Sequence, residues 1–413
     1  MSRAVLSTSS KLSGVSYSLR GPLAARAESM RAEGRSVVSM NVGDPVAHGL
    51  PPRPEVVRAM RDGIDRSAAY GPARGLPDAR EAVAGHYRGK GFDTVEAEDV
   101  YLGNGVSELA ASTLHALLEP QDEVLIPAPD YPMWTASTVL AGGRPVHYPC
   151  DETSGWLPDP VALRDRITAR TRAIVAINPN NPTGSVWPRP VVDAIAALAR
   201  RHGLLLLADE IYDDFLYDGA LHSPLATCAP DTPCVTFGGL SKRSRVPGFR
   251  MGWAVLTGPR AARATLATAL DTVTSLRLCP NVPAQRVVPT ALRVDDTKDL
   301  TGPGGAFRHR RDHLLRALAG IPGIHCVKPG GAFYAFPRID VRRYRVDGDA
   351  LAGGLLREEG LLVVPGAGLG PVPPGHLRMV TMPPCDVIDD VAERLARFLE
   401  RHDSRRTWCG SVP

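Results

Sequence analysis

The chain has 413 residues, of which 44% are hydrophobic and 22% are charged, and its formal net charge is +4. This length is sufficient for two domains with substantial cores, and the composition is that of an ordinary globular protein. The 48 basic residues are interspersed among 44 acidic ones, and no basic stripe alternates with aromatic residues. We therefore expect no nucleic-acid partner.

The seven cysteines are scattered and show neither a Cys-x-x-Cys pair nor a Cys/His spacing typical of metal sites. We accordingly expect no metal site and a reducing compartment. The N-terminus lacks the apolar run of a signal peptide, and no later run is long enough to span a membrane. The sequence therefore predicts a cytoplasmic protein without a membrane partner.

Taken in order, the chain predicts a flexible Ser-rich tail over 1–16 and a segment over 17–49 that contains a strand ending at Gly43. From residue 50 to 295, short apolar strands alternate with helical patterns, which predicts an α/β domain with a mainly parallel sheet. From 296 to 413, helices mix with short strands, which predicts a smaller α+β domain that residues 17–49 join. The expected strands lie near 37–42, 100–102, 124–126, 173–177, 204–207, 234–237, 253–256, 325–327, 332–336, 361–364 and 377–380, and the expected helices near 76–87, 106–118, 259–293, 306–319, 348–359 and 385–401.

Polar residues follow several of the expected strands of the larger domain, at 103–107, 127–134, 178–184 and 208–212. The carboxyl edge of an open α/β sheet is where ligands bind, so these segments indicate a site. The glycine turn before Ser107 opens a helix, where unpaired N–H groups can hold an anion, although plain N-capping is the more common explanation.

The segment 237–253 carries the strongest single candidate for chemistry. The chain has only five lysines, and Lys242 alone lies among turn-forming glycines, with Ser241 beside it and Arg250 eight residues later. A nearby cation can lower the pKa of a lysine or hold a phosphate, so Lys242 is a candidate for Schiff-base chemistry. An exposed basic loop is the alternative.

Five motifs in this order resemble those of the fold-type I, class I/II aminotransferases that depend on pyridoxal 5′-phosphate. The resemblance runs from Tyr17 to about Phe398 and is closest to the bacterial alanine (glutamate–pyruvate) aminotransferases. It implies a large domain with a mainly parallel sheet, a smaller α+β domain, and a bound pyridoxal 5′-phosphate. The motifs are Gly103-Asn-Gly-Val-Ser-Glu-Leu, Pro127-Ala-Pro-Asp-Tyr-Pro-Met-Trp, Asn178-Pro-Asn-Asn-Pro-Thr-Gly, Ala208-Asp-Glu-Ile-Tyr-Asp and Gly239-Leu-Ser-Lys…Gly248-Phe-Arg-Met-Gly-Trp.

The resemblance implies roles for the residues that would hold the cofactor ring. Lys242 would bind the cofactor as a Schiff base and later carry a proton. Asp209 would keep the pyridine nitrogen protonated, so that the ring acts as an electron sink. Asn181 and Tyr212 would hydrogen-bond the 3′-oxygen, and Tyr131 would stack on the ring. By itself, an aspartate at a strand end such as Asp209 is usually a cap or turn residue, and Tyr131 is more often a packed aromatic.

The resemblance also implies a phosphate site. The backbone N–H groups of Gly105 and Val106, with Ser107 alongside, would form it. The side chains of Ser241 and Arg250 would add contacts, because a guanidinium donates in a planar fork that suits phosphate.

In the family, a tyrosine from the neighbouring subunit reaches the same phosphate, and Tyr70 matches it. This implies an obligatory homodimer with shared active sites, whereas a core aromatic is the alternative for Tyr70. For the substrate, Arg378 would bind the α-carboxylate, with the N–H of Gly43 and with Asn181, and Tyr17 would border the site. A structural ion pair is the alternative for Arg378.

Some positions depart from the family pattern. Gly239 replaces a common serine, Arg243-Ser244 replaces the expected Thr-Tyr pair and suggests a different lip of the site, and Pro247 and Leu369 are also unusual. Arg277 is a speculative anchor for a side-chain carboxylate, and we favour a surface arginine at this position.

We therefore expect a transaminase that acts on an amino acid and a 2-oxo acid, with alanine and glutamate as donors. The alternative is another reaction through the same quinonoid intermediate, such as β- or γ-elimination, replacement or C–C bond formation. A DNA-binding regulator would need an N-terminal domain for which the residues before Tyr17 leave no room.

Overall fold

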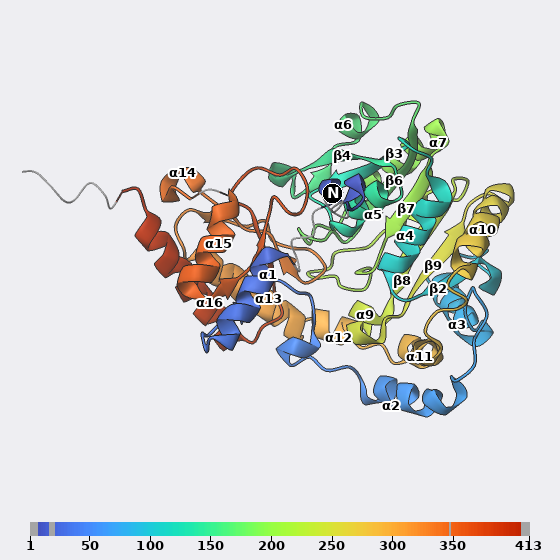
Figure 1. The fold of residues 1–413 in the computed structure, drawn as a ribbon, viewed down its shortest axis with the longest axis horizontal. Coiled ribbons are helices and arrows are strands. Elements are labelled where there is room, and N and C mark those ends of the chain that lie inside the picture. Colours follow the sequence, from blue (N-terminus) through green and yellow to red (C-terminus); the bar gives the residue numbers. More distant parts are fainter. Residues whose placement is uncertain (1–6, 16–20, 347, 406–413) are drawn as a thin grey trace, which may run out of the picture.

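A computed structural model describes residues 7–15, 21–346 and 348–405. Figure 1 shows two lobes, one formed by a large sheet with its helices and the other by α1, α13, α15 and α16. The first lobe is built from the middle of the chain. The second combines the N-terminal helix α1 with elements near the C-terminus.

The central sheet has eight strands in the order β2-β9-β8-β7-β6-β3-β4-β5. Strands β8, β7, β6, β3 and β4 pair in parallel, whereas β9 is antiparallel to both β8 and β2. The parallel strands are apolar runs because both of their faces are covered. The strands are β2 (Val100–Gly103), β3 (Glu123–Ala128), β4 (Arg144–Asp151), β5 (Leu157–Pro158), β6 (Thr171–Ile177), β7 (Leu205–Asp209), β8 (Cys234–Gly239) and β9 (Gly252–Thr257).

Helices cover both faces of this sheet. One buried cluster includes residues of α3, α7 and α11, and another includes residues of α4, α5 and α10. The arrangement is the α/β fold that the sequence predicts. The helices of this lobe are α2 (Pro54–Gly63), α3 (Pro77–Arg88), α4 (Val106–Leu117), α5 (Met133–Leu140), α6 (Pro160–Arg164), α7 (Arg189–His202), α8 (Leu225–Cys228), α9 (Leu240–Arg243), α10 (Arg260–Ser275) and α11 (Val282–Arg293).

The second lobe has its own core and only short strands. Strand β1 (Val38–Ser39) pairs in parallel with β13 (Leu361–Leu362), and β15 (Leu377–Val380) pairs with both β11 (Tyr334–Ala335) and β14 (Val364–Pro365). The remaining elements are β10 (Ile324–His325), β12 (Arg338–Ile339), α1 (Pro22–Ala32), α12 (Thr297–Thr301), α13 (Ala306–Ala319), α14 (Val341–Tyr344), α15 (Gly348–Glu359) and α16 (Cys385–His402).

An aromatic segment that follows β7 joins the two lobes. Tyr212, Phe215 and Tyr217 belong to the buried cluster of the second lobe, where they pack with Phe333 and Tyr334. The carboxyl edge of the large sheet is therefore fixed against β11. The domain boundaries at 49/50 and 295/296 stay a prediction.

Two local features differ from the sequence-based expectations. Within the expected flexible tail, Ser10–Gly14 form a 3₁₀ helix beside α5, in which the Lys11 ammonium donates to the carbonyl of Leu140. The single helical stretch expected over 259–293 is two helices, because the chain leaves helical geometry at Leu278, whose φ is 68°. No helix in the described parts of the chain combines the length and apolar character needed to cross a bilayer.

Candidate active site

A pocket of about 650 Å³ lies where the carboxyl edge of the large sheet meets the second lobe. The segments that follow the strands of the sheet supply most of its lining, while Tyr334 of β11 and the loop after β1 close the opposite side. Ten of the residues singled out from the sequence line this one pocket: Gly43, Val106, Ser107, Tyr131, Asn181, Asp209, Tyr212, Ser241, Lys242 and Arg250.

Lys242 projects into the pocket from the short helix α9, which directly follows strand β8. Its Nζ donates a hydrogen bond of 2.8 Å to the backbone carbonyl of Gly43 and lies 5.5 Å from the centre of the Phe333 ring. The lysine therefore carries its amine to the boundary between the lobes. Among the described residues this carbonyl is the one hydrogen-bond partner of the amine, which can therefore exchange it for a ligand group.

Asp209, the last residue of β7, is buried in the floor of the pocket. Its Oδ2 accepts a hydrogen bond of 2.8 Å from the indole N–H of Trp134, whereas its Oδ1 is buried without a partner among the described residues. Burial raises the pKa of Asp209 to about 6, although the hydrogen bond from Trp134 opposes this shift. The orphaned oxygen is suited to a cationic N–H donor on a bound ligand.

This buried carboxyl group should reduce the stability of the ligand-free protein near neutral pH. The folded protein keeps the proton up to about pH 6, whereas the unfolded chain releases it near the ordinary pKa of 3.8, so the free energy of unfolding falls as the pH rises between these values. We expect Asp209→Asn to raise the free energy of unfolding at pH 7 by about 3 kcal/mol. Near pH 4, where the folded carboxyl group is already neutral, the difference should shrink. Urea titrations at both pH values measure it.

Asp271 provides a control of opposite sign. Its hydrogen bond from Arg74 lowers its pKa, so its carboxylate stabilises the fold at pH 7, and Asp271→Asn should lower the free energy of unfolding. A loss of stability in Asp209→Asn at pH 7 would contradict the assignment of Asp209 as a strained site group.

The N-terminus of α4 forms the opposite end of the pocket. The N–H groups of Val106 and Ser107 have no acceptor within the helix, and both residues line the pocket. Gly105 has a φ of 96°, and the guanidinium of Arg250 occupies the space that a Cβ there would need. This end therefore offers N–H donors and a cation, a combination that binds phosphate groups.

Arg378 lies behind the pocket wall and does not line the pocket. It is fully buried on β15, donates to Oδ1 of Asn181 at 3.0 Å and to the carbonyl of Asn41, and its Nε has no partner among the described residues. The guanidinium has no carboxylate partner in the described part of the chain, so a buried cation without a counter-ion lies directly behind Asn181 of the pocket wall. The Arg378 bond to Oδ1 also turns the amide nitrogen of Asn181 away from Arg378.

Tyr70 and Arg277 do not line the pocket of their own chain. The side chain of Tyr70 is 82% exposed and does not reach the pocket of its own chain. Arg277 is not a free surface arginine, because its guanidinium pairs with Glu108 and donates to the carbonyls of Ala73 and Leu102. Tyr17 lies outside the described residues.

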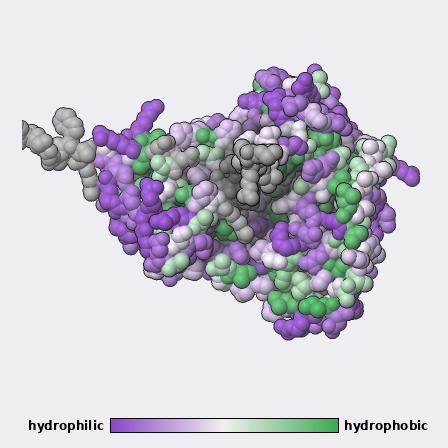
Figure 2. All heavy atoms as spheres, viewed as in Figure 1, coloured by the Kyte–Doolittle hydropathy of each residue, from purple (hydrophilic) through white to green (hydrophobic). Residues whose placement is uncertain are grey.

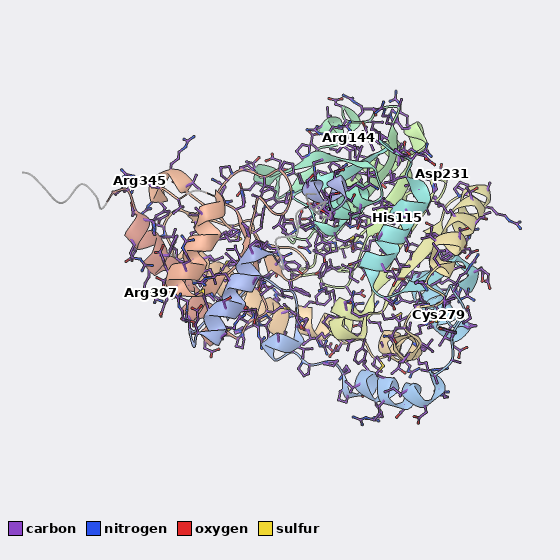
Figure 3. All side chains as sticks on the ribbon, in the orientation of Figure 1. His115, Arg144, Asp231, Cys279, Arg345 and Arg397 are labelled. Carbon is purple, nitrogen blue, oxygen red and sulfur yellow. The ribbon has the colours of Figure 1, made fainter. Side chains whose placement is uncertain are left out.

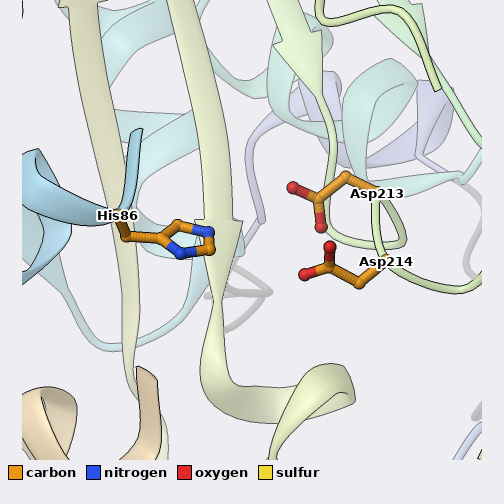
Figure 4. Close-up of side chains that lie close together, drawn as sticks. All are labelled: His86, Asp213 and Asp214. Carbon is orange, nitrogen blue, oxygen red and sulfur yellow. The ribbon is translucent and has the colours of Figure 1, made fainter. Parts of the chain in front are cut away.

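Arg243, expected at the lip of the site, points away from it. Its buried side chain pairs with Asp214 at 3.0 Å and with Asp295 at 2.7 Å, and it meets Nε2 of His86 at 2.8 Å. Figure 4 shows that His86, Asp213 and Asp214 face one another. Burial, followed by Arg243, lowers the pKa of His86 to about 3.

The same cluster contains a second cation. Lys90 bonds Asp213 at 2.5 Å and Asp214 at 3.1 Å, so both carboxylates are neutralised by side chains of the protein. The group is an ion-pair network that holds α9, and its spacing does not require a metal.

Comparison with known proteins agrees with this geometry. The family model described as aminotransferase class I and II matches residues 35–401. The chain belongs to the aminotransferase class I and II family. An alanine aminotransferase of Mycobacterium tuberculosis is 47% identical over 394 residues, covering 95% of this chain and 92% of that protein. The glutamate–pyruvate aminotransferase AlaA of Escherichia coli is 43% identical over 393 residues, covering 95% and 97%.

Solved structures of the same kind have the same fold. A crystal structure of an Escherichia coli aminotransferase gives a TM-score of 0.95 at 42% identity and covers 97% of this chain and all of that one, 100%. An alanine aminotransferase from Pyrococcus furiosus gives a TM-score of 0.89 at 32% identity, covering 96% and 100%. The predicted family and the predicted fold class are therefore confirmed.

For this aminotransferase-family chain, sequence reasoning missed two side chains at the site. Trp134 supplies the one side-chain hydrogen bond to Asp209, and Tyr334 lines the pocket from β11. Trp134 follows Tyr131 by three residues at the start of a helix, a spacing that could have indicated it. Nothing in the local sequence distinguishes Tyr334 from its buried aromatic neighbours.

Proposed function

We propose that the protein is a pyridoxal 5′-phosphate-dependent aminotransferase that moves an amino group between an L-amino acid and a 2-oxo acid. The observation that carries the proposal is the orphaned Oδ1 of buried Asp209 in the same pocket as the amine of Lys242. The names of the relatives support alanine with pyruvate and glutamate with 2-oxoglutarate as the substrate pairs.

The residues fit this cofactor. Its pyridine N–H matches the free oxygen of Asp209, and its phosphate matches the N–H groups of Val106 and Ser107 with Arg250. Its aldehyde would bind Lys242. When bound, the cofactor would supply an electron sink for the negative charge that develops at the substrate α-carbon.

The chain's own groups would position the substrate and move the proton. In this proposal, Lys242 Nζ takes the proton from the α-carbon, and the free Nε of Arg378 binds the substrate carboxylate behind Asn181. The phenol of Tyr212 would donate to the 3′-oxygen of the cofactor. The second lobe would shield these groups from water.

Product analysis tests the proposal. Purified protein with pyridoxal 5′-phosphate should convert alanine and 2-oxoglutarate into pyruvate and glutamate, identified by mass. Amino donors offered singly should each release their own 2-oxo acid in one stoichiometric turnover. Products that keep the amino group, or that lose a β- or γ-substituent, would instead assign elimination or replacement chemistry to this scaffold.

We also propose a homodimer with shared sites. The highly exposed Tyr70 is accompanied by other exposed apolar side chains, Leu276 at 84%, Leu278 at 55% and Ile64 at 55%. Figure 2 shows apolar residues gathered over α2 and α11, and Figure 3 places Cys279, next to Leu278, at this side of the molecule. A second copy would cover this surface and bring Tyr70 to the phosphate end of the partner's pocket.

Mixing two inactive variants checks the shared site. Tyr70→Ala and Lys242→Ala proteins should each be poorly active, but a mixture that exchanges subunits should regain activity, because one of the two sites in a mixed dimer receives an intact Tyr70 and an intact Lys242. A monomer in sedimentation, or no gain on mixing, would contradict the proposal. As a control, Tyr70→Ala mixed with itself should stay at its own level.

A cytoplasmic location is part of the same proposal. The six described cysteines are all free, which suits a reducing compartment.

A further inference from the structure

Tyr334 has no assigned role in the proposed reaction, although it contacts three residues of the site. Its hydroxyl shares a hydrogen bond of 2.8 Å with that of Tyr212. The same hydroxyl fills the space that a Cβ at Gly43 would occupy, and the Gly43 carbonyl accepts the bond from Lys242. The ring of Tyr334 lies 4.6 Å from the guanidinium carbon of Arg378.

The two phenols are both 2% exposed, and both line the pocket. Among the described residues, each hydroxyl is the other's hydrogen-bond partner. Two hydroxyls carry two protons, and their mutual bond uses one. A ligand oxygen that accepts from Tyr212 therefore selects the arrangement in which Tyr334 donates to Tyr212 and Tyr212 donates into the pocket.

Such a chain strengthens its terminal donor, because each hydrogen bond polarises the next one. The ring of Tyr334 acts separately. It covers one face of the buried guanidinium of Arg378, whose Nε has no bond partner among the described residues, and thereby holds the cation in place without using its donors.

We propose that Tyr334 is a positioning residue with two separable actions. Its hydroxyl makes Tyr212 a stronger hydrogen-bond donor to the cofactor, and its ring orients Arg378 for the substrate carboxylate. The proposal rests on the proposed function. It couples the cofactor end and the carboxylate end of the pocket through one side chain of the second lobe.

The hydroxyl is tested with Tyr334→Phe and the absorbance of the bound cofactor as a function of pH. A hydrogen bond to the anionic 3′-oxygen favours the deprotonated form, so a weaker donor should move the midpoint of the titration upward, by roughly 0.3 pH units or more. Tyr212→Phe should cause a larger shift in the same direction. If Tyr334 acts through Tyr212, adding Tyr334→Phe to the Tyr212→Phe protein should cause no further shift.

Tyr217 offers a matched control. It lies in the same aromatic cluster, its hydroxyl donates to the Ala332 carbonyl at 2.7 Å, and Arg311 lies 4.2 Å from its ring centre. Tyr217→Phe therefore removes a similar buried hydrogen bond but should leave the midpoint unchanged. A general loosening of the core would instead shift the titration midpoint of both Tyr334→Phe and Tyr217→Phe.

The ring is tested by the binding of propionate to the cofactor-loaded protein, measured by calorimetry. Tyr334→Phe should bind propionate within about twofold of the original protein, and Tyr334→Leu about fivefold more weakly. Suppose that the original protein binds pyridoxal 5′-phosphate and the absorbance of the bound cofactor titrates with pH, but Tyr334→Phe has the same midpoint. The role of the hydroxyl is then overturned, and the proposed function stands. Equal propionate affinity in Tyr334→Leu overturns the role of the ring. If the original protein binds no cofactor, both proposals fall.

Discussion

Lys242→Ala is expected to lower the rate of amino transfer by about 10⁴-fold, a loss typical of removing a positioned general base. Lys242 is the lysine that lines the pocket, and its amine is held by one hydrogen bond to the Gly43 carbonyl. The measurement is the formation of pyruvate from alanine in a single turnover, so that cofactor affinity and chemistry are read separately.

Two controls distinguish lost chemistry from lost structure. Lys298→Ala alters an exposed lysine of α12 and should leave the rate unchanged. A small primary amine in the buffer should restore part of the activity to Lys242→Ala, because it can accept the same proton in the space that the side chain vacates. Full activity in Lys242→Ala would remove the basis of the proposed mechanism.

Asp209→Asn should lower the rate about 10³-fold, the factor that corresponds to a cost of roughly 4 kcal/mol for a buried charge that loses its partner. The amide cannot hold the proton on the pyridine nitrogen as a carboxylate does. Asp209→Glu, which keeps the charge, should retain more activity than Asp209→Asn. The single-turnover rate at saturating cofactor measures both.

For Asp209→Asn we therefore expect opposite effects on stability and on activity. The same change should stabilise the ligand-free protein at pH 7 and disable the loaded one. Trp134→Phe should lose less activity than Asp209→Asn, since it removes the indole donor from Oδ2 but keeps the charge. A variant Asp209→Asn with normal turnover would show that the carboxylate is not needed for the reaction.

The sequence predicted the large sheet and its ligand edge because parallel strands are apolar throughout and end at polar segments, so Asp209, Asn181 and Lys242 could be assigned to one edge. It could not predict which side chains the second lobe contributes. Strand β11 is two residues long and lies in an aromatic run, and its pairing with β15 depends on contacts distant in the chain.

The direction in which a side chain points could likewise not be predicted from the local sequence. Arg243 and Lys242 are neighbours on one short helix, yet Lys242 enters the pocket and Arg243 enters a buried ion-pair network. The partner Asp295 lies 52 residues away, and no local pattern links the two. The predicted place of Arg243 at the lip was wrong for this reason.

That network has an evolutionary consequence. Replacing Arg243 alone would leave Lys90 as the one cation beside Asp213 and Asp214 among the described residues and would take from Asp295 its 2.7 Å partner, whereas replacing Arg243 and Asp295 together would remove one charge of each sign. Neutral drift at these positions should therefore proceed by paired exchange. Relatives that carry an uncharged residue in place of Arg243 should also lack an acidic residue at the position of Asp295, and this correlation can be read from sequences alone.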